Sequence, residues 1–381
     1  MHYAIISETW PPEVNGVALT VRALAAGLEA RGHRVTVVRP RQSRNQVAPL
    51  GTRLVGSLPL PRYPGLRMGR PAGAMLRRAW GLERPDAVYV ATEGPLGNSA
   101  LDAARALGIP VATGLHTRFD HYMGAYGAGL LRGVALAWMR HFHNRGQATL
   151  VPTRELQEEL AALGFRQVRR LARAVDTAQF RPSHRDRDLR AGWNAGPDDP
   201  VLLHVGRLAP EKNLALAIRA HRAVQARLPG ARMVLVGDGP LRDAIARKHP
   251  DLVFAGTRRG ADLARHYASA DLFVFPSLTE TFGNVTLEAM ASGLPVVAHA
   301  TGAAGEHVSD GRNGVTVPPG AEDAFVSACV HLATEAELRR AMGVAARRAT
   351  GGLDPAAVAA DFDRLLQSLA LEAGHGSRSF A

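Results

Sequence analysis

Short apolar runs alternate with amphipathic helical stretches along almost the whole chain, and this alternation limits the possible fold more than any other feature. Runs such as "HYAIIS", "RVTVV", "DAVYVAT" and "ATLVPT" are separated by stretches such as "VALTVRALAAGLEARG". Apolar strands separated by amphipathic helices are typical of parallel β-α-β units, whose helices cover both faces of the sheet. The sequence therefore predicts an α/β protein with doubly wound parallel sheets.

The alternation lapses once, over residues 173–199, which are rich in charge, proline and glycine. Strand-like runs then resume with "PVLLHVGR", and 381 residues exceed the size at which one core keeps growing. We therefore expect a Rossmann-like domain over 1–172, a linker over 173–199 and a second Rossmann-like domain over 200–354. Two such domains would face each other across a cleft and bind ligands at the carboxyl ends of their strands.

Two carboxylates follow one predicted strand of the second domain, in "FPSLTETFGNVTLEAM". Asn284 is a suitable N-cap for a helix that begins at Val285, so Glu280 belongs to the loop and Glu288 to the first turns of the helix. The amides of Gly283, Asn284 and Val285 would be free to bind phosphate or sugar oxygens, and the carboxylates could accept hydrogen bonds from vicinal hydroxyls. The pattern indicates a ligand with an anionic centre and hydroxyl-rich ends, such as a sugar nucleotide.

The stretch "HVGRLAPEKN" supplies two cations after the first strand of the same domain. Arg207 offers a planar fork and Lys212 a compact charge, which together suit the neutralisation of a leaving diphosphate. The chain contains two lysines, Lys212 and Lys248, among 46 basic residues. A lysine at this turn is therefore a stronger signal than it would be in a lysine-rich chain.

In the first domain, candidate residues also follow predicted strands. Gly16 in "SETWPPEVNGV" would let the backbone approach a ligand, and His116 ends the strand in "GLHTRFDHYM". Asp120 and Tyr122 in the same stretch are weaker candidates for acceptor binding. No GxGxxG fingerprint occurs after the first strand, which argues against a classical NAD domain.

The positive charge is concentrated in the first half of the chain. The net charge of the whole chain is +12. Residues 1–183 hold 24 arginines and 12 acidic residues, which already accounts for this +12, so the net charge of residues 184–381 is zero. Such asymmetry indicates an anionic partner, either a membrane surface or nucleic acid. The membrane interpretation rests on basic residues interleaved with amphipathic side chains in residues 62–80. The predicted membrane-surface residues are Arg62, Arg67, Arg70, Arg77, Arg78 and Trp80.

Taken together, "PPEVNG", "GRLAPEKN", "VLVGDGP" and "FPSLTETFGNVTLEAMASGLPVVA", with Glu280 and Glu288 spaced as E-x7-E, resemble the retaining glycosyltransferases of family 4, which have the GT-B fold. The resemblance covers nearly the whole chain. The stretches "PPEVNGVALTV" and "GLHTRFDHY" are similar to bacterial enzymes that glycosylate lipids, including GDP-mannose-dependent α-mannosyltransferases. The resemblance to family 4 implies that the helix at 355–371 packs back on the first domain.

The resemblance also implies roles for the candidate residues. Arg207 and Lys212 would hold the donor diphosphate, Glu288 the ribose, and Glu280 with the backbone of Phe282 to Val285 the hexose and phosphates. His116 would lie beside the hexose and Gly16 beside the phosphates, while Thr257 and Arg258 lie where the base could be selected. The reaction would transfer a hexose, with mannose favoured, and would retain the α configuration without a metal or other cofactor.

Three classes of function remain at this level. The favoured one is a hexosyltransferase with a membrane lipid or lipid-linked glycan as acceptor, and the alternative is a soluble transferase that uses a UDP-sugar and a small acceptor. A nucleic-acid-binding protein is disfavoured because no recognition motif or regular aromatic platform accompanies the arginines. A single cysteine excludes an internal disulfide framework, and the "DRD" at 186–188 lies in the polar connection, so no metal site is expected. The N-terminus lacks the features of a signal peptide, and no apolar run is long enough to span a bilayer, so we expect a cytoplasmic protein at the inner face of the membrane.

Overall fold

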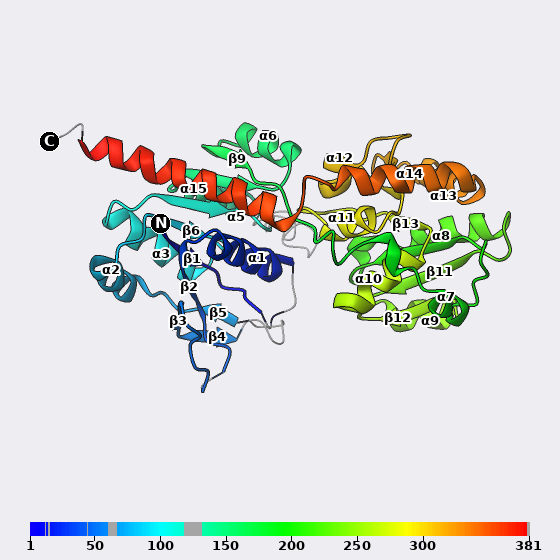
Figure 1. Cartoon of the computed structure of the whole chain (residues 1–381), viewed down its shortest axis with the longest axis horizontal. Helices are drawn as coiled ribbons and strands as arrows, with labels where there is room; N and C mark the ends of the chain where they lie inside the picture. The colour runs from blue at the N-terminus through cyan, green and yellow to red at the C-terminus, as the bar shows by residue number, and fades with distance from the viewer. Residues whose placement is uncertain (12, 14–15, 44, 60–66, 118–131, 379–381) are drawn as a thin grey trace. The chain divides into compact units, whose positions relative to one another are not determined.

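The computed structural model describes residues 1–11, 13, 16–43, 45–59, 67–117 and 132–378, with only the backbone described at 374–378. The chain forms two compact units. The first comprises Met1–Ala174 together with Pro355–Ala381, and the second comprises Val175–Asp354. Residues 175–199, where the sequence pattern lapses, are part of the second unit (Figure 1).

The first unit is built on a seven-stranded parallel sheet with the order β3-β2-β1-β6-β7-β8-β9. Its strands are β1 (His2–Ile6), β2 (Arg34–Pro40), β3 (Thr52–Val55), β6 (Ala87–Val90), β7 (Val111–Gly114), β8 (Ala148–Val151) and β9 (Val168–Arg170). A separate antiparallel pair consists of β4 (Ser57–Pro59) and β5 (Arg67–Gly69). The described helices are α1 (Gly16–Ala30), α2 (Gly73–Leu82), α3 (Pro95–Ala106), α5 (Arg132–His143), α6 (Arg154–Ala162) and α15 (Pro355–Arg378).

The second unit contains a six-stranded parallel sheet with the order β12-β11-β10-β13-β14-β15. Its strands are β10 (Val201–Val205), β11 (Arg232–Val236), β12 (Val253–Gly256), β13 (Leu272–Phe275), β14 (Val296–His299) and β15 (Gly314–Val317). Its helices are η2 (Pro182–His184), α7 (Arg187–Gly192), η3 (Pro210–Lys212), α8 (Leu214–Gln225), α9 (Arg242–Lys248), α10 (Gly260–Ser269), α11 (Asn284–Ala291), α12 (Gly302–His307), α13 (Glu322–Thr334) and α14 (Ala336–Ala349).

The central strands are buried on both faces, which explains why they are apolar throughout. In β1, Tyr3 and Ile5 pack into one core while Ala4 and Ile6 pack into the core on the opposite face. In β10, Val201 and Leu203 likewise pack into one core while Leu202 packs into the core on the opposite face. Successive side chains of a strand point to opposite faces, so a strand covered by helices on both sides reads as a continuous apolar run. The predicted doubly wound α/β class is confirmed.

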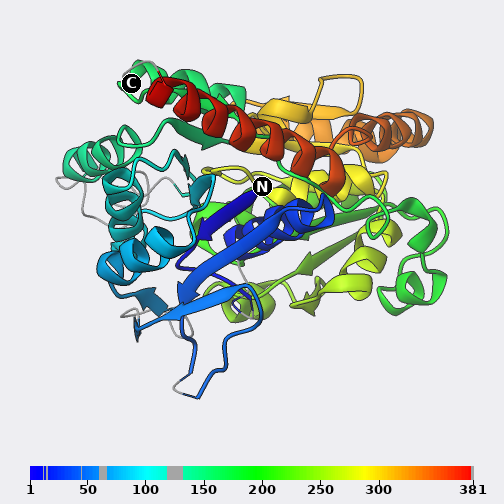
Figure 2. The ribbon, with the colours of Figure 1, turned by 60° about the vertical axis from the view of Figure 1, so that its left-hand side comes forward.

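Helix α15 closes one face of the first unit, where it lies beside α1 (Figures 1 and 2). Its Asp363 is buried and accepts hydrogen bonds from the Tyr3 hydroxyl at 3.0 Å and from Nε of Arg31 at 2.8 Å. Burial alone would raise the pKa of Asp363, but hydrogen bonds from Arg31, His33, Gln367 and Tyr3 lower it to about 2. The carboxylate therefore stays ionised and fixes α15 to the amino-terminal edge of the sheet.

One residue expected at the surface lies in the core. Trp80 is 3% exposed and packs with Leu76, one helical turn earlier, in the cluster between α2 and the first sheet. The helical period places these two side chains on the inner face of α2. The prediction that Trp80 belongs to a membrane-facing surface is therefore wrong, whereas Arg77 and Arg78 on the same helix are exposed.

Candidate functional site

Two loops meet at the carboxyl edge of the second sheet, because β10 and β13 are neighbours in it. The loop after β10 carries Arg207 and Lys212, and the loop after β13 carries Glu280. The amide of Leu278 donates to the carbonyl of Glu211 at 2.9 Å and joins the two loops. The structure thus brings together residues that are about seventy positions apart in the sequence.

Lys212 is held between the loops. Its ammonium group forms an ion pair with Glu280, lies 3.5 Å from Oγ of Ser277 and stands 5.3 Å from the centre of the Phe275 ring. The Lys212 and Glu280 side chains are 16% and 13% exposed, so solvent screens this pair less than a surface pair. An aromatic face beneath a cation adds further attraction. The pair presents one fixed cation and one fixed anion at the edge of the sheet.

Arg207 differs from Lys212 in its surroundings. Its side chain is 55% exposed, and its contact with a carboxylate is a loose one, 3.8 Å to Glu211. A guanidinium held so loosely can turn toward an incoming anion with little loss of existing contacts. The site therefore combines a fixed ammonium with a loosely held, solvent-facing guanidinium.

The helix that follows Glu280 begins one residue earlier than the sequence indicated. Gly283 occupies the N-cap position of α11 with φ of +84°, and Asn284 is the first helical residue, so the prediction of Asn284 as N-cap is wrong. A left-handed backbone at the cap favours glycine over asparagine. The first amides of a helix have no intrahelical acceptor, so those of Asn284 and Val285 remain donors at this end. Phe282 is buried, and its backbone continues into the cap.

A second turn supports the loop that carries Glu280. The amide of Ala303 donates to the carbonyl of Phe282 at 2.6 Å, at the start of α12. Gly302 has φ of +55°, and a Cβ there would lie 2.4 Å from that carbonyl oxygen and 3.0 Å from Cβ of Glu280. Only glycine permits this close approach, so the start of α12 packs directly against the loop that carries Glu280 and supports it.

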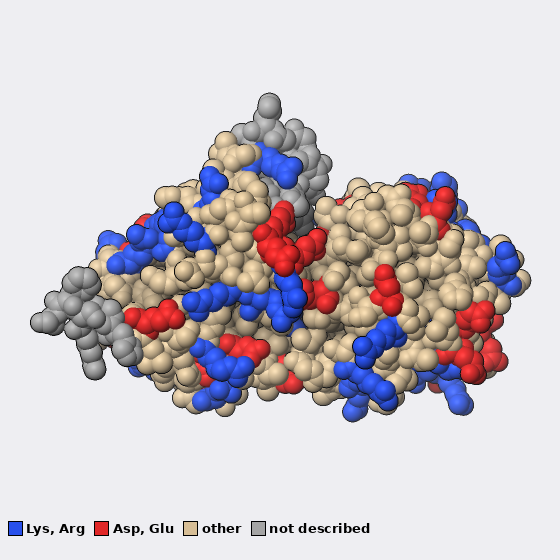
Figure 3. Space-filling model, turned by 90° about the horizontal axis from the view of Figure 1, so that it is seen from above, with Lys and Arg blue, Asp and Glu red and all other residues tan. Residues whose placement is uncertain are grey.

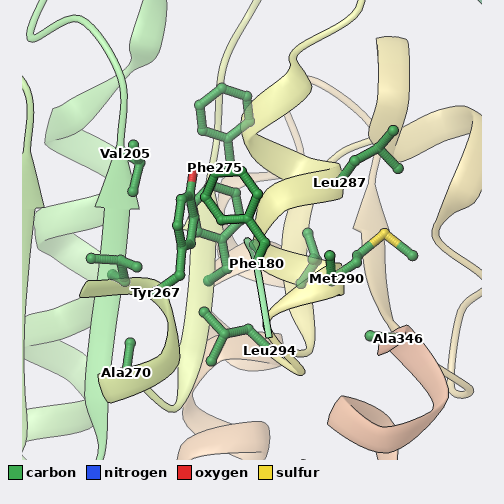
Figure 4. Packing of buried hydrophobic residues seen from close by; sticks show 14 of the residues in the cluster. Phe180, Val205, Tyr267, Ala270, Phe275, Leu287, Met290, Leu294 and Ala346 are labelled. Atoms are coloured by element: carbon green, nitrogen blue, oxygen red, sulfur yellow. The ribbon is translucent and has the colours of Figure 1, made fainter. Parts of the chain in front are cut away.

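Glu288 lies one turn into α11 and contacts the neighbouring helix α10. The Tyr267 hydroxyl of α10 donates to Oε2 of Glu288 at 2.9 Å. Tyr267 is fully buried in the apolar cluster that Figure 4 shows, together with Phe275, Leu287 and Met290. Burial raises the pKa of Glu288 to about 7, although the bond from Tyr267 opposes the rise. Near neutral pH this carboxyl can therefore either accept or donate a hydrogen bond to a hydroxyl.

Thr257 and Arg258 follow the edge strand β12 and are both exposed. Arg258 donates through Nε to the Ala255 carbonyl at 2.7 Å and contacts Asp262 at 3.1 Å. They lie two strands away from β10 in the sheet order, beyond β11. No contact with the Lys212–Glu280 pair is found for them within the described part of the chain.

In the first unit, His116 lies just after β7 at the carboxyl edge of the sheet. Its Nε2 is 2.8 Å from the Tyr89 hydroxyl, and its Nδ1 accepts a hydrogen bond from Arg173. Gly16 begins α1 and is exposed. Asp120 and Tyr122 lie outside the described residues.

On the face of the first unit that Figure 3 shows, the described basic residues do not form a single patch. The unit carries 25 arginines and 14 acidic residues, whereas the second carries 21 basic and 20 acidic residues. Figure 3 shows one face on which basic groups are interspersed with acidic ones. Arg70 is exposed, Arg67 donates to Oγ of Ser57 at 2.7 Å, and Arg62 lies outside the described residues.

Sequence reasoning missed three residues that shape these sites. Tyr267, Gly302 and Arg173 act through partners that are 21, 20 and 57 positions away, respectively. No local motif reveals such contacts, because each depends on which strands become neighbours in the sheet. The one available signal is the small-residue turn "AHATG" at 298–302, which follows a strand-like run and indicates close backbone approach.

Both halves of the chain match known families of glycosyltransferases. Residues 14–179 match the model described as Glycosyltransferase Family 4, and residues 199–335 match the model described as Glycosyl transferases group 1. A GDP-mannose-dependent alpha-mannosyltransferase of Mycolicibacterium smegmatis is 39% identical over 91% of this chain and 92% of its own length.

Two further comparisons extend this result. A GDP-mannose-dependent alpha-(1-6)-phosphatidylinositol monomannoside mannosyltransferase of the same species is 29% identical over 90% of this chain and 92% of its own length. Anabaena Alr3699/HepE, solved in complex with UDP, aligns with a TM-score of 0.76 and 20% identity, covering 97% of this chain and 100% of that one. A structural likeness at 20% identity shows the fold alone, and this one confirms the predicted GT-B architecture.

Replacing Gly302 with alanine should destabilise the second unit. The added methyl group would clash with the Phe282 carbonyl and would also force alanine into a left-handed backbone. Gly311→Ala is the matched control, since Gly311 has φ of +72° but no atom within 4 Å of its Cβ position. In denaturant unfolding we expect Gly302→Ala to lose about 2 kcal/mol more than Gly311→Ala. Equal losses in the two variants would show that the backbone conformation alone matters.

The raised pKa of Glu288 predicts a pH-dependent stability. An unfolded glutamate titrates near pH 4.3, so between about pH 4.3 and pH 7 the folded state binds more protons than the unfolded state. The contribution of Glu288 to stability is therefore fully present below pH 4 and falls until about pH 7. Glu288→Gln should reduce the loss of unfolding free energy between pH 5 and pH 8, whereas the exposed control Glu337→Gln should not. The same pH dependence in wild type and Glu288→Gln would contradict this assignment.

Proposed function

The chain belongs to glycosyltransferase family 4, and from this premise we propose that it transfers mannose from GDP-mannose to a membrane lipid or lipid-linked glycan, with retention of the α configuration. That the enzyme is a glycosyltransferase using a nucleotide sugar follows from the family. The choice of GDP-mannose is supported by the 39% identity with an enzyme named for that donor. The choice of a lipid is supported by a relative named for phosphatidylinositol monomannoside.

We assign the donor to the carboxyl edge of the second sheet. The observation that carries this assignment is the fixed Lys212–Glu280 pair next to the N-terminus of α11. Lys212 and Arg207 would neutralise the diphosphate, and the amides of Asn284 and Val285 would add donors to its oxygens. Glu280 would accept hydrogen bonds from the hexose hydroxyls and Glu288 from the ribose. Thr257 and Arg258 would contact the base from the edge of the sheet.

The proposed reaction depends on positioning and on stabilising the leaving group. As the bond from the sugar to the diphosphate breaks, negative charge develops on the phosphate, and a fixed cation stabilises it without reorganisation. The departing phosphate oxygen would take the proton of the acceptor hydroxyl on the same face, so that configuration is retained. His116 of the first unit would contact the hexose, and Gly16 the phosphates. The two cations would supply the charge that a metal ion supplies in other transferases.

Turnover measurements on the two cation sites test this function. We expect Lys212→Ala and Arg207→Ala each to lower the transfer of mannose from GDP-mannose at least about 100-fold, the scale of losing one major charge-stabilising contact. Lys248→Ala is the matched control, because Lys248 is the other lysine and lies exposed at the end of α9. Activity should persist in EDTA, and labelled product should partition into detergent.

Near-normal turnover in both cation variants would overturn the donor assignment. Product that stays in water would point to the soluble acceptor instead. Loss of activity in EDTA, restored by a divalent cation, would contradict the metal-independent mechanism.

We further propose that the first unit binds an anionic membrane surface. The unit carries the excess of arginine, and α5 exposes Val134 and Trp138 on one face, at 65% and 47% exposure, beside Arg132 and Arg140. Apolar side chains flanked by basic ones suit the headgroup region of a bilayer. No helix among the described residues is long and apolar enough to cross a bilayer.

Sedimentation with vesicles tests the membrane surface. Phosphatidylglycerol vesicles should carry the protein down at low salt and release it at high salt, because screening weakens the attraction. Trp138→Ser together with Val134→Ser should weaken binding, whereas Leu82→Ser, an exposed residue of α2, should not. Failure to bind these vesicles at low salt would contradict the proposal.

A further inference from the structure

A buried arginine at the carboxyl edge of the first sheet has no acidic partner among the residues that the structure describes. Arg173, three residues past the end of β9, is 9% exposed, and its one hydrogen bond goes to Nδ1 of His116. Within the described residues Arg173 forms no ion pair and no second hydrogen bond. A guanidinium has five N–H donors, so most of them have no protein acceptor here.

Two other arginines, the buried Arg190 and the half-buried Arg347, are fully engaged, whereas among the described residues the buried Arg39 has no partner for its Nε and one hydrogen bond of 3.5 Å to the Pro40 carbonyl. Arg190 in the second unit pairs with Asp271 at 2.8 Å and also donates to the carbonyls of Gly196, at 2.8 Å, and Asp199, at 2.7 Å. Arg347 donates to three backbone carbonyls at 2.7 and 2.8 Å. Burial of an uncompensated charge is costly, which is why such saturation is the rule. Arg39 and Arg173 both depart from that rule, but against the effect of burial the charge of Glu13 raises the pKa of Arg39, whereas no described carboxylate does so for Arg173.

Two carboxylates that follow strands at the same edge of this sheet are already occupied by other groups. Glu93, just after β6, accepts a hydrogen bond from Nε2 of His143 at 3.0 Å. Glu8, just after β1, accepts from the amide of Leu96 at 2.9 Å, at the start of α3, and from the amide of Gly69 at 3.2 Å. Neither acid is free to neutralise Arg173.

The contact of Arg173 with His116 leaves its charge uncompensated. Arginine can only donate, so Nδ1 of His116 is the acceptor, and Nε2 carries the proton and donates to the Tyr89 oxygen. Burial, and then the charge of Arg173, keep the pKa of His116 well below its usual range, so the ring is neutral. Gly114 makes room for this array, since a Cβ there would lie 2.1 Å from the Tyr89 hydroxyl and 2.7 Å from Nε2 of His116.

We propose that Arg173, oriented by His116 and Tyr89, binds an anionic group of the acceptor, a phosphate or a carboxylate. An oxyanion would accept hydrogen bonds from the unused N–H groups and supply the missing counter-charge. The inference rests on the proposed function in assigning the anion to the acceptor. The donor diphosphate is assigned to the second unit, where Lys212, Arg207 and the N-terminus of α11 already serve it. The first unit then distinguishes charged acceptors from neutral ones.

The first experiment is thermal unfolding of the full chain with inorganic phosphate as probe, in saturating GDP so that the donor site is filled. Phosphate should raise the melting temperature of wild type, and Arg173→Gln should need at least about tenfold more phosphate for the same shift, since one charge-assisted contact is lost. Arg166→Gln, at an exposed arginine of the same unit, is the matched control and should respond as wild type. Without phosphate, Arg173→Gln should melt no lower than wild type, because it removes an unpaired buried charge.

The second experiment identifies the source of the anion. Binding of dihexanoyl phosphatidylglycerol and of uncharged dihexanoylglycerol is compared in the same three proteins. Preference for the charged lipid in wild type and Arg166→Gln, and its loss in Arg173→Gln, supports a lipid headgroup. A response to inorganic phosphate without any lipid preference supports the same site with a soluble anionic acceptor.

Three results would overturn the proposal. The first is an equal phosphate response in Arg173→Gln and Arg166→Gln. The second is weaker GDP binding in Arg173→Gln, which would place the anion on the donor. The third is marked destabilisation of Arg173→Gln without phosphate, which would show a structural role. The proposed function fails separately, if GDP does not raise the melting temperature of wild type. The two failures therefore remain distinguishable.

Discussion

The ion pair between Lys212 and Glu280 is the interaction on which the organisation of the second unit's site depends. It links a loop after β10 to a loop after β13, above the ring of Phe275 and with α12 behind it. Because each charge neutralises the other, both can be held largely out of water before any ligand arrives. In the proposed function, the diphosphate of the donor would take the cation of this pair and the hydroxyls of its sugar the anion.

The two units use the same edge of similar sheets for different purposes. In the first unit Glu8 fills the N-terminus of α3, so the protein's own carboxylate takes the position where a phosphate could bind. In the second unit the cap of α11 is a left-handed glycine, and the helix amides face no such internal carboxylate among the described contacts. One fold therefore leaves a helix N-terminus open for the proposed diphosphate in the second unit and fills one with a carboxylate in the first. The anion site proposed for the first unit is instead the buried Arg173.

Much of this was accessible from the sequence, for reasons that differ between features. Continuous apolar strands identify a doubly wound sheet, and turn residues after strands locate Lys212, Glu280 and His116 at carboxyl edges, because these signals are local. The partners of these residues could not be predicted, since the pairing of Tyr267 with Glu288 and of Arg173 with His116 depends on which strands lie side by side. Trp80 was misplaced because a large amphipathic side chain suits a core and a membrane surface equally well by type. The same ambiguity of type made Asn284 look like the cap that Gly283 provides.

Helix α15 has a further consequence for how the chain acquires its structure. Phe362 of this helix packs 4.9 Å from the ring of Tyr89, centre to centre, and Asp363 binds Tyr3, so a segment that follows the second unit in the chain completes the core of the first. The second unit is continuous, from Val175 to Asp354, and is synthesised before α15. Domains ordinarily fold from the N-terminus during synthesis. Here the order is reversed for the final step: the first unit cannot complete its core around Tyr89 until α15 has been made, after the whole of the second unit.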